Sequence, residues 1–330
     1  MAVLDLSLGH HHLAQGVRGY EMTKQTHSVI LGAGPMGRSI AQTLAARGEA
    51  VTVVTRDGRT IGTGIGVGKA DLSNMEQTIA ACGGAEAIYH CAAPPYHKWD
   101  ESFPALQKAA IAAAEATGAV LIAVENLYGY GVSGTLTEDM PLTAATRKGA
   151  LRARLSQELL AAHASGRAQC VAGRATDFFG PGVRISALGE RFWPALLSGK
   201  PVDWLGDPDA PHSFAYMPDL AAAYVTLART PSAWGQAWHL PALPPVTVRE
   251  ICDMVVLGGD APTKIRQTPS WLLRAVGLFQ PAAGELVEMR YMFDKDFVID
   301  HTKFDQTFGA VNRNWEAPLK ETLAWWGAET

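Results

Sequence analysis

The chain has 330 residues, with 28 lysines and arginines against 32 aspartates and glutamates, and a net charge of −4. At roughly 100–200 residues per domain, this length accommodates one large domain or two smaller ones. An apolar content of 48% with 18% charged residues excludes an intrinsically disordered chain. The acidic balance without basic clusters argues against a nucleic-acid partner. No apolar run reaches the ~18 residues that a membrane helix needs, so no membrane partner is expected.

The N-terminal residues 1–26 show neither a strand nor a helix pattern and predict a flexible tail. They also lack the basic start and apolar core of a secretory signal. The four cysteines have no C-x-x-C spacing, which favours free thiols in a reducing compartment. We therefore expect a cytoplasmic protein.

From residue 27 onward, short apolar runs alternate with helical patterns up to about residue 175. The expected strands are 28–31, 50–54, 65–70, 85–91, 119–124 and 169–172. The expected helices are one that begins at Pro35 and three more over 73–81, 103–117 and 143–164. Continuous apolar strands separated by helices predict an α/β fold, with a parallel sheet covered on both faces. A Rossmann-type, doubly wound domain is thus predicted over 27–175.

Beyond this domain the rhythm changes. Prolines and glycines, beginning with Gly180-Pro-Gly182, separate shorter elements. The pattern predicts a smaller substrate-binding lobe over 176–330, from which part of the chain returns to the Rossmann-type domain.

A glycine motif, Gly32-x-Gly34-x-x-Gly37, lies between the first expected strand and the following helix. Gly32 permits a tight turn, Gly34 lets the backbone approach a pyrophosphate, and Gly37 lets the helix pack on the strand. Pro35 suits the first helical position, and Met36 begins the apolar face of the helix. These five residues predict a dinucleotide site, and a purely structural glycine turn is the alternative.

The second expected strand is followed by Arg56 and Asp57. Arginine at this place can pair with the 2′-phosphate of NADP, whereas an acidic residue would bind the ribose hydroxyl of NAD. Arg56 favours NADP, with NAD as the alternative, and a surface position without a ligand would also explain it. Asp71 and Leu72 close the third strand, where Asp71 could accept from the adenine amino group or cap the helix that follows.

Taken in order, these motifs make the chain resemble a known family. Ala70-Asp71-Leu72, Leu127-Tyr128-Gly129, Phe179-Gly-Pro-Gly182 and Phe214-Ala-Tyr-Met-Pro-Asp219 join the glycine motif, and Pro318 to Trp326 resembles the family's last helix. The chain is similar to an atypical member of the extended short-chain dehydrogenase/reductase (NAD-dependent epimerase/dehydratase) family from Ser28 to Trp326. Extended members often pair through helices like the one expected over 143–164, so the resemblance leaves a homodimer open.

The catalytic residues of this family are not matched. The family has Ser or Thr four residues before its V-Y-G tyrosine, where this chain has Val124. Its Tyr-x-x-x-Lys segment corresponds to Lys148-Gly-Ala-Leu-Arg152. The resemblance implies that Arg152 holds the nicotinamide ribose, as the family's lysine does. Arg152 cannot tune a proton donor in the same way, because an arginine pKa stays above ~12.

The proton for a carbonyl substrate must therefore come from another group. Tyr128 and Lys148 are the first candidates, and His97 in the loop after the fourth strand is the third. Each has a plainer interpretation: Tyr128 as a packing residue, Lys148 with Arg152 as a solvated helix face, and His97 as a structural loop residue.

Further residues near these candidates are expected to line the site. The resemblance places Ala92 and Ala93 against the nicotinamide ribose. Other nearby polar residues, Glu125 and Tyr130, could also substitute for the missing catalytic groups, and His90 is expected to be a core histidine with satisfied hydrogen bonds. Candidate substrate-lining residues are Tyr96, Trp99, Asn126, Asp177, Phe178, Phe192 and His212. Core packing would explain the aromatic members equally well, and no metal site is predicted.

Three functions fit these observations. The first is an NADP-dependent oxidoreductase that acts on a small carbonyl or alcohol substrate. The second is a non-catalytic NAD(P)-binding sensor or regulator, which the unmatched catalytic residues would explain. The third is a nucleotide-sugar epimerase or dehydratase with tightly held NAD, against which Arg56 argues.

Overall fold

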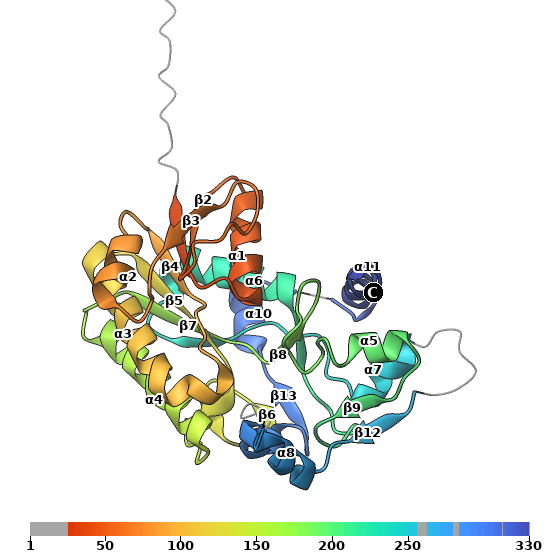
Figure 1. Cartoon of the computed structure of the whole chain (residues 1–330). Coiled ribbons are helices and arrows are strands. Elements are labelled where there is room, and N and C mark those ends of the chain that lie inside the picture. Colours follow the sequence, from red (N-terminus) through yellow and green to blue (C-terminus); the bar gives the residue numbers. More distant parts are fainter. Residues whose placement is uncertain (1–25, 256–262, 280–283, 312, 330) are drawn as a thin grey trace, which may run out of the picture.

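The computed structural model describes residues 26–255, 263–279, 284–311 and 313–329. A seven-stranded parallel sheet lies at the centre of the larger part of the molecule (Figure 1). In spatial order its strands are β11 (Ala237–His239), β7 (Cys170–Arg174), β5 (Val120–Glu125), β4 (Ala87–His90), β1 (His27–Leu31), β2 (Ala50–Thr55) and β3 (Gly66–Lys69). The order reverses between β1 and β4, as in a doubly wound sheet.

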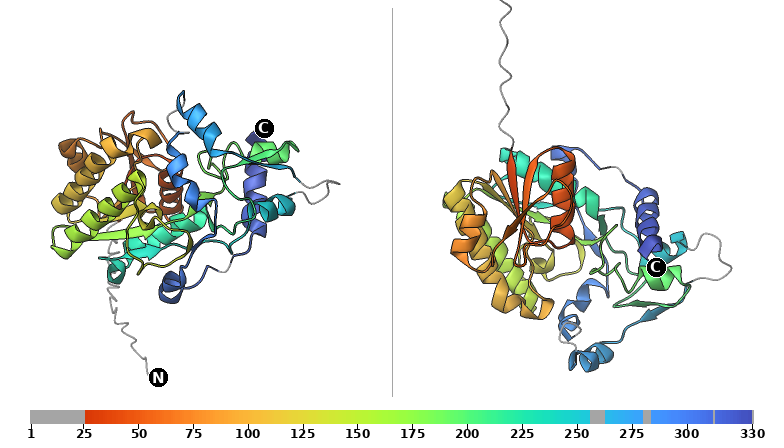
Figure 2. Two further views of the ribbon diagram at one scale, coloured as in Figure 1. Left: turned by 90° about the horizontal axis from the view of Figure 1, so that it is seen from below. Right: turned by 45° about the horizontal axis from the view of Figure 1, so that its top comes forward.

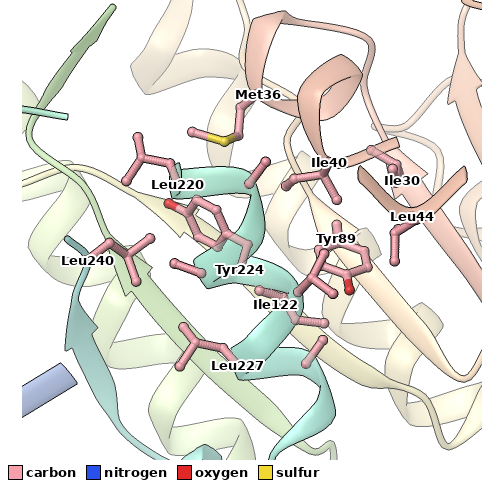
Figure 3. Close-up of a cluster of buried hydrophobic side chains, with 14 of the residues drawn as sticks. Ile30, Met36, Ile40, Leu44, Tyr89, Ile122, Leu220, Tyr224, Leu227 and Leu240 are labelled. Atoms are coloured by element: carbon pink, nitrogen blue, oxygen red, sulfur yellow. The ribbon is translucent and has the colours of Figure 1, made fainter. Parts of the chain in front are cut away.

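One face of the sheet is covered by helices α1 (Pro35–Ala46) and α6 (Met217–Arg229), which pack against each other. Figure 3 shows this core, in which Ile40 of α1 and Tyr224 of α6 lie with Tyr89 of β4. Helix α10 (Thr302–Phe308) adds Phe304 to the same cluster.

The other face is covered by α2 (Met75–Ala81), α3 (Trp99–Thr117) and α4 (Arg147–Ala164). Successive strand residues point to opposite faces, so Ile88 packs on this side while Tyr89 packs on the other. Burial on both faces is why the strands are apolar throughout.

The smaller lobe is built on three short parallel ladders between segments far apart in the sequence. They are β8 (Asp177–Phe179) with β10 (Phe214–Tyr216), β9 (Val202–Trp204) with β12 (Ile265–Gln267), and β6 (Gly134–Leu136) with β13 (Phe297–Ile299). The helices of the lobe are α5 (Trp193–Leu197), α7 (Val248–Val255), α8 (Ser270–Gly277) and α11 (Glu316–Glu329). Figure 2 shows the sheet with its helices beside this lobe from two further directions.

An aromatic core fills the smaller lobe. Phe179 stacks on Trp315 with ring centroids 5.2 Å apart, and Phe192 meets Trp193 edge-on at 4.9 Å. Phe192 is only 1% exposed. The expectation that Phe192 lines the substrate site is therefore wrong, because the side chain is enclosed by its aromatic neighbours.

The predicted Rossmann-type fold is confirmed, and the six expected strands form with ends shifted by a few residues. Helix α3 begins at Trp99 rather than at residue 103, since Asp100 and Glu101 suit the first turn of a helix. The chain returns to the sheet through α6 and β11, which the strand pattern did not locate. Thr26, the last residue of the predicted tail, is hydrogen-bonded to Glu49, and residues 1–25 lie outside the described residues. In the part of the chain that the structure describes, we find no helix with the length and hydropathy of a membrane span.

Candidate active site

The candidate residues gather at the carboxyl edge of the sheet. The glycine motif follows β1, Ala92 to Tyr96 follow β4, Asn126 to Tyr128 follow β5, and Asp177 comes shortly after β7. These four strands are neighbours in the sheet. Ligands of doubly wound proteins bind at this edge, beside the point where the strand order reverses.

The glycine turn packs directly on the loop after β4. Gly32 has a φ of 104°, and a Cβ there would lie 2.8 Å from the Cα of Ala92. A Cβ on Gly37 would lie 2.1 Å from the carbonyl oxygen of Gly32. At Gly34, in contrast, a Cβ would meet no atom within 4 Å, so the turn opens to free space at this residue.

Helix α1 begins at this open place. Gly34 is its N-cap residue and Pro35 its first residue, and neither a capping side chain nor an acidic residue occupies the first turn. The first N–H groups and the positive end of the helix dipole are therefore available to an anion. Met36 turns its side chain into the core, so only its backbone can face a ligand (Figure 3). The turn fits the pyrophosphate of a dinucleotide.

The loop after β2 separates its two charged candidates. Asp57 accepts a hydrogen bond from the Thr55 hydroxyl at 2.9 Å and pairs with Arg59 at 3.3 Å, and these contacts lower the pKa of Asp57. Arg56 is exposed. The loop thus keeps Asp57 engaged within itself and presents Arg56 to solvent.

Asp71 is held in a turn after β3. Its carboxylate accepts from the Ser73 hydroxyl at 2.7 Å and the Ser73 amide at 3.0 Å, and these bonds, followed by the charge of Arg56, lower its pKa. The N-cap of α2 is Asn74, which accepts from the amide of Gln77 at 3.0 Å. Asp71 therefore does not cap the helix, and Leu72 packs in the core.

Arg152 of α4 is buried at the edge of β5. Its guanidinium donates to the carbonyl of Val124 at 3.2 Å and lies 4.9 Å from the ring centroid of Phe103. Its Nε atom has no partner among the described residues. A buried donor without a partner costs free energy unless a ligand or water supplies an acceptor, so Arg152 fits the expected contact with a ribose.

His90 lies close enough to Arg152 to feel its charge. Burial, followed by that charge, lowers the pKa of His90 from 6.5 to about 4. Neither ring nitrogen of His90 has a hydrogen-bond partner within the described ranges. The expectation of a satisfied core histidine is wrong in this respect, because the surrounding chain brings no donor or acceptor to the ring.

Lys148 is fully buried at the start of α4. Its ammonium donates to the carbonyl of Tyr96 at 2.8 Å, pairs with Glu285 at 2.6 Å, and lies 4.4 Å from the ring centroid of Tyr96. The neighbouring Arg147 pairs with Glu285 as well, and its amide donates to Glu288 at 2.9 Å. The solvated helix face is therefore the wrong interpretation for Lys148 and Arg152, and the ammonium of Lys148 is engaged by protein groups.

Two phenols face each other in front of Lys148. The hydroxyl oxygens of Tyr96 and Tyr128 are 3.5 Å apart. Trp99 backs both rings, stacked on Tyr128 at 5.8 Å and edge-on to Tyr96 at 4.9 Å. Asn126 accepts a hydrogen bond from the amide of Tyr128 at 3.3 Å. Burial raises the pKa of both phenols, so each keeps its proton and can donate a hydrogen bond.

His97 takes no part in this cluster. It is exposed in the short helix η1 (Tyr96–Lys98) and contributes to none of the contacts described above. Ala93 is likewise exposed, whereas Ala92 is half-buried against Gly32.

Asp177 and His212 form a pair that the sequence analysis did not foresee. The Nε2 atom of His212 lies 2.9 Å from an oxygen of Asp177, although the residues are far apart in sequence. The β8–β10 ladder brings them together by pairing Asp177 with Phe214. Phe178, the next residue of β8, is half-buried against the core formed with α1 and α6.

Two further candidates, Glu125 and Tyr130, belong to a buried hydrogen-bond network at the ends of β5, β7 and β11. Arg174 donates to Glu125 at 3.2 Å and to the hydroxyl of Tyr130 at 2.7 Å. Tyr130 in turn lies 2.6 Å from Nε2 of His239. Glu125 and Tyr130 thus stabilise the junction of β5, β7 and β11 rather than substituting for the missing catalytic groups.

Comparison with known proteins identifies the group of enzymes to which this arrangement is related. The model of the NAD dependent epimerase/dehydratase family matches residues 29–239. The chain belongs to this family. Its members are NAD-dependent enzymes, which agrees with the glycine turn on β1. No curated protein matches the sequence.

Several solved structures share the fold across almost the whole chain. DesIV from Streptomyces venezuelae, a dTDP-glucose 4,6-dehydratase with NAD bound, has a TM-score of 0.73 and 17% identity over 91% of this chain and 96% of its own. A UDP-N-acetylglucosamine 4-epimerase from Methanobrevibacter ruminantium has a TM-score of 0.74 and 18% identity over 93% and 100%. WbmH from Bordetella bronchiseptica, in complex with NAD+, has a TM-score of 0.70 and 19% identity over 92% and 98%.

Proposed function

We propose that the protein is an NAD(P)-dependent enzyme that transfers a hydride at an alcohol or carbonyl carbon of a nucleotide sugar. One observation carries the proposal: the anion-binding turn after β1 and the phenol pair after β4 and β5 share one edge of the sheet. Support for the substrate class comes from the family and from the fold shared with a sugar-nucleotide dehydratase and epimerase.

Named residues fit the parts of a bound dinucleotide. The turn at Gly34 and the start of α1 would hold the pyrophosphate, and the unpartnered Nε of Arg152 would hold the nicotinamide ribose. The bound nicotinamide supplies hydride transfer. Tyr128 would donate a hydrogen bond to the reacting oxygen of the substrate, with Tyr96 and Trp99 fixing its ring.

The first experiment tests for redox-neutral turnover. The cofactor released from purified protein is identified, and a panel of UDP- and dTDP-sugars is incubated with protein and NAD. The expected result is an epimerised or dehydrated sugar, detected by NMR, without net change in NADH absorbance. Unchanged sugars across the panel, despite bound cofactor, would contradict the proposed substrate class.

Tyr128→Phe tests the phenol. We expect turnover to fall by roughly 10²-fold, the lower end of the effect of removing one hydrogen-bond donor to a developing oxyanion, with unchanged cofactor affinity. His97→Ala is the control, because His97 is exposed outside the cluster. Loss of turnover in Tyr128→Phe also separates an enzyme from the NAD(P)-binding regulator that the unmatched catalytic residues had suggested.

A second candidate is an NADP-dependent oxidoreductase that acts on a small carbonyl or alcohol. The observation that favours it is the exposed Arg56 beside an internally paired Asp57. Steady oxidation of NADPH in the presence of a small carbonyl, with no change in any nucleotide sugar, would favour this candidate over the first.

A further inference from the structure

The Asp177–His212 pair has no role in the proposal above. His212 donates from Nε2 to one oxygen of Asp177 at 2.9 Å, since an ionised carboxylate can only accept. The side chain of His212 is 3% exposed, and that of Asp177 is 22% exposed. The second carboxylate oxygen, Oδ1, makes no hydrogen bond to a described residue. One oxygen is thus fixed by the protein, while the other remains available.

The imidazole of His212 is held rigidly. The backbone amide of His212 donates to the carbonyl of Val246 at 3.0 Å. Its ring lies parallel to Phe293, with centroids 5.4 Å apart and an interplanar angle of 5°, and also contacts Phe214 and Phe297. Aromatic rings on these sides exclude water and keep Nε2 directed at the carboxylate.

Asp177 lies at the same edge of the sheet as the two phenols. It follows β7, whereas Tyr128 follows β5 and Tyr96 follows β4, and these three strands are adjacent. The negative charge of Asp177 acts on both phenols and, after burial, contributes to raising the pKa of each. His212 is hydrogen-bonded to Asp177, and the charge of Asp177 acts on Tyr96 and Tyr128.

The phenols cannot serve as the base for this reaction. Oxidation of an alcohol needs a group that accepts the hydroxyl proton, and the raised pKa of Tyr128 keeps its own proton in place. Lys148, at the place of the family's tyrosine, is held by Tyr96 and Glu285. A partly exposed carboxylate with a free oxygen has the required chemistry.

We propose that Asp177 is the catalytic base and acid for a neutral hydroxyl of the substrate, and that His212 is the residue that positions it. The assignment rests on the proposed hydride transfer. In the oxidation, the O–H bond breaks and its proton passes to Oδ1 of Asp177. The hydrogen on the carbon that bears this hydroxyl would leave with the electron pair of the C–H bond as hydride, which a bound oxidised NAD(P) would accept, and a C=O bond would form. The return step reverses each transfer.

Asp177→Asn tests the base, because it keeps the shape and removes the proton acceptor. We expect kcat for nucleotide-sugar turnover to fall ~10²-fold or more, and the loss of activity at acid pH to disappear from the pH profile. Cofactor affinity, measured by NAD(P)H fluorescence, is expected to stay unchanged. Asp203→Asn is the matched control, since Asp203 is exposed and pairs with Arg266 in the smaller lobe.

His212 is tested by two substitutions. His212→Phe keeps the aromatic packing and removes the donor, so kcat is expected to fall with little change in KM, whereas His212→Gln restores a donor and part of kcat. A second readout needs no substrate: the Nε2 proton of His212 is expected to give a slowly exchanging NMR resonance that is absent in His212→Phe and shifted in Asp177→Asn.

These results separate the inference from the proposed function. Full kcat and an unchanged acid limb in Asp177→Asn would overturn the assignment of the base. If the unmodified protein binds cofactor but turns over no substrate, the proposed function fails. The imidazole resonance then decides the pairing, and its absence from the unmodified protein would overturn the positioning role.

Discussion

The ion pair between Lys148 and Glu285 gives the sharpest test of how the smaller lobe is held to the sheet domain. The Lys148 side chain is 1% exposed and its ammonium lies 2.6 Å from the Glu285 carboxylate. Glu285→Gln leaves a buried ammonium with the Tyr96 carbonyl and aromatic rings as its remaining partners. Removing one partner of a buried pair costs about 3–5 kcal/mol. Glu285 is 17% exposed and glutamine still offers an acceptor, so we expect about 2–3 kcal/mol.

Urea unfolding followed by circular dichroism measures this loss of unfolding free energy, and thermal unfolding measures the corresponding change in melting temperature. At about 2.1 cal/mol/K per residue, the unfolding entropy of a 330-residue chain is about 0.7 kcal/mol/K, so the melting temperature should fall by about 3–4 °C. Arg147→Ala is the control, because Arg147 is 54% exposed and its pair with Glu285 is expected to contribute less than about 1 kcal/mol.

The contribution of the Lys148–Glu285 pair to the stability of the protein depends on pH in a defined direction. Burial opposes ionisation of Glu285, but hydrogen bonds from Arg147 and Lys148 prevail and lower its pKa below the usual 4.5. The contribution of the pair is therefore complete above pH 4.5 and is lost as the pH falls through the lower, folded value. The difference between Glu285→Gln and the unmodified protein should shrink in acid. Equal stability of the two proteins at neutral pH, or a Lys148→Met/Glu285→Gln protein less stable than Glu285→Gln alone, would refute the reasoning.

Four further predictions concern the sheet edge. Gly34→Val should fold normally but bind NADH and NADPH more weakly in fluorescence titrations, whereas Gly37→Ala should lower the melting temperature because its Cβ would meet the Gly32 carbonyl. His90 should destabilise the folded protein in acid, because its pKa is lowered from 6.5 to about 4. The free energy of unfolding should drop by about 3 kcal/mol as the pH falls across this interval. In urea titrations, His90→Met should remove this drop with pH. Arg56→Ala should reduce a preference for NADPH by roughly 10- to 150-fold, the value of a charge-assisted contact, and equal affinities in the unmodified protein would contradict NADP specificity.

The sheet could be predicted from the sequence because its signals are local. Apolar strands, the turn from Gly32 to Gly37 and the helical spacing of Met36 and Ile40 all lie within short windows. Strand β11 has three residues and no such pattern, and its place beside β7 is fixed by tertiary packing.

The candidate site depends on contacts that a local pattern cannot contain. Lys148 meets Glu285, and Asp177 meets His212, across large separations in the sequence. The resemblance to the family therefore identified Asp177 and Lys148 as site residues, but not the pairs that they form. The same limit explains Tyr130, whose hydroxyl is engaged by Arg174 in the core.

The ladders of the smaller lobe join early and late parts of the chain, so each ladder can form only after its later strand has been synthesised. β6 (Gly134–Leu136) emerges from the ribosome long before its partner β13 (Phe297–Ile299), and the carboxylate of Glu285 is also made late. Until then, the backbone groups of β6 and the ammonium of Lys148 lack these partners. Pairings of such long range form slowly, and they leave strand edges open while translation continues. A nascent chain stalled before residue 285 would hold the dinucleotide turn and all seven strands of the central sheet, but β6 would lack its partner strand and Lys148 its carboxylate.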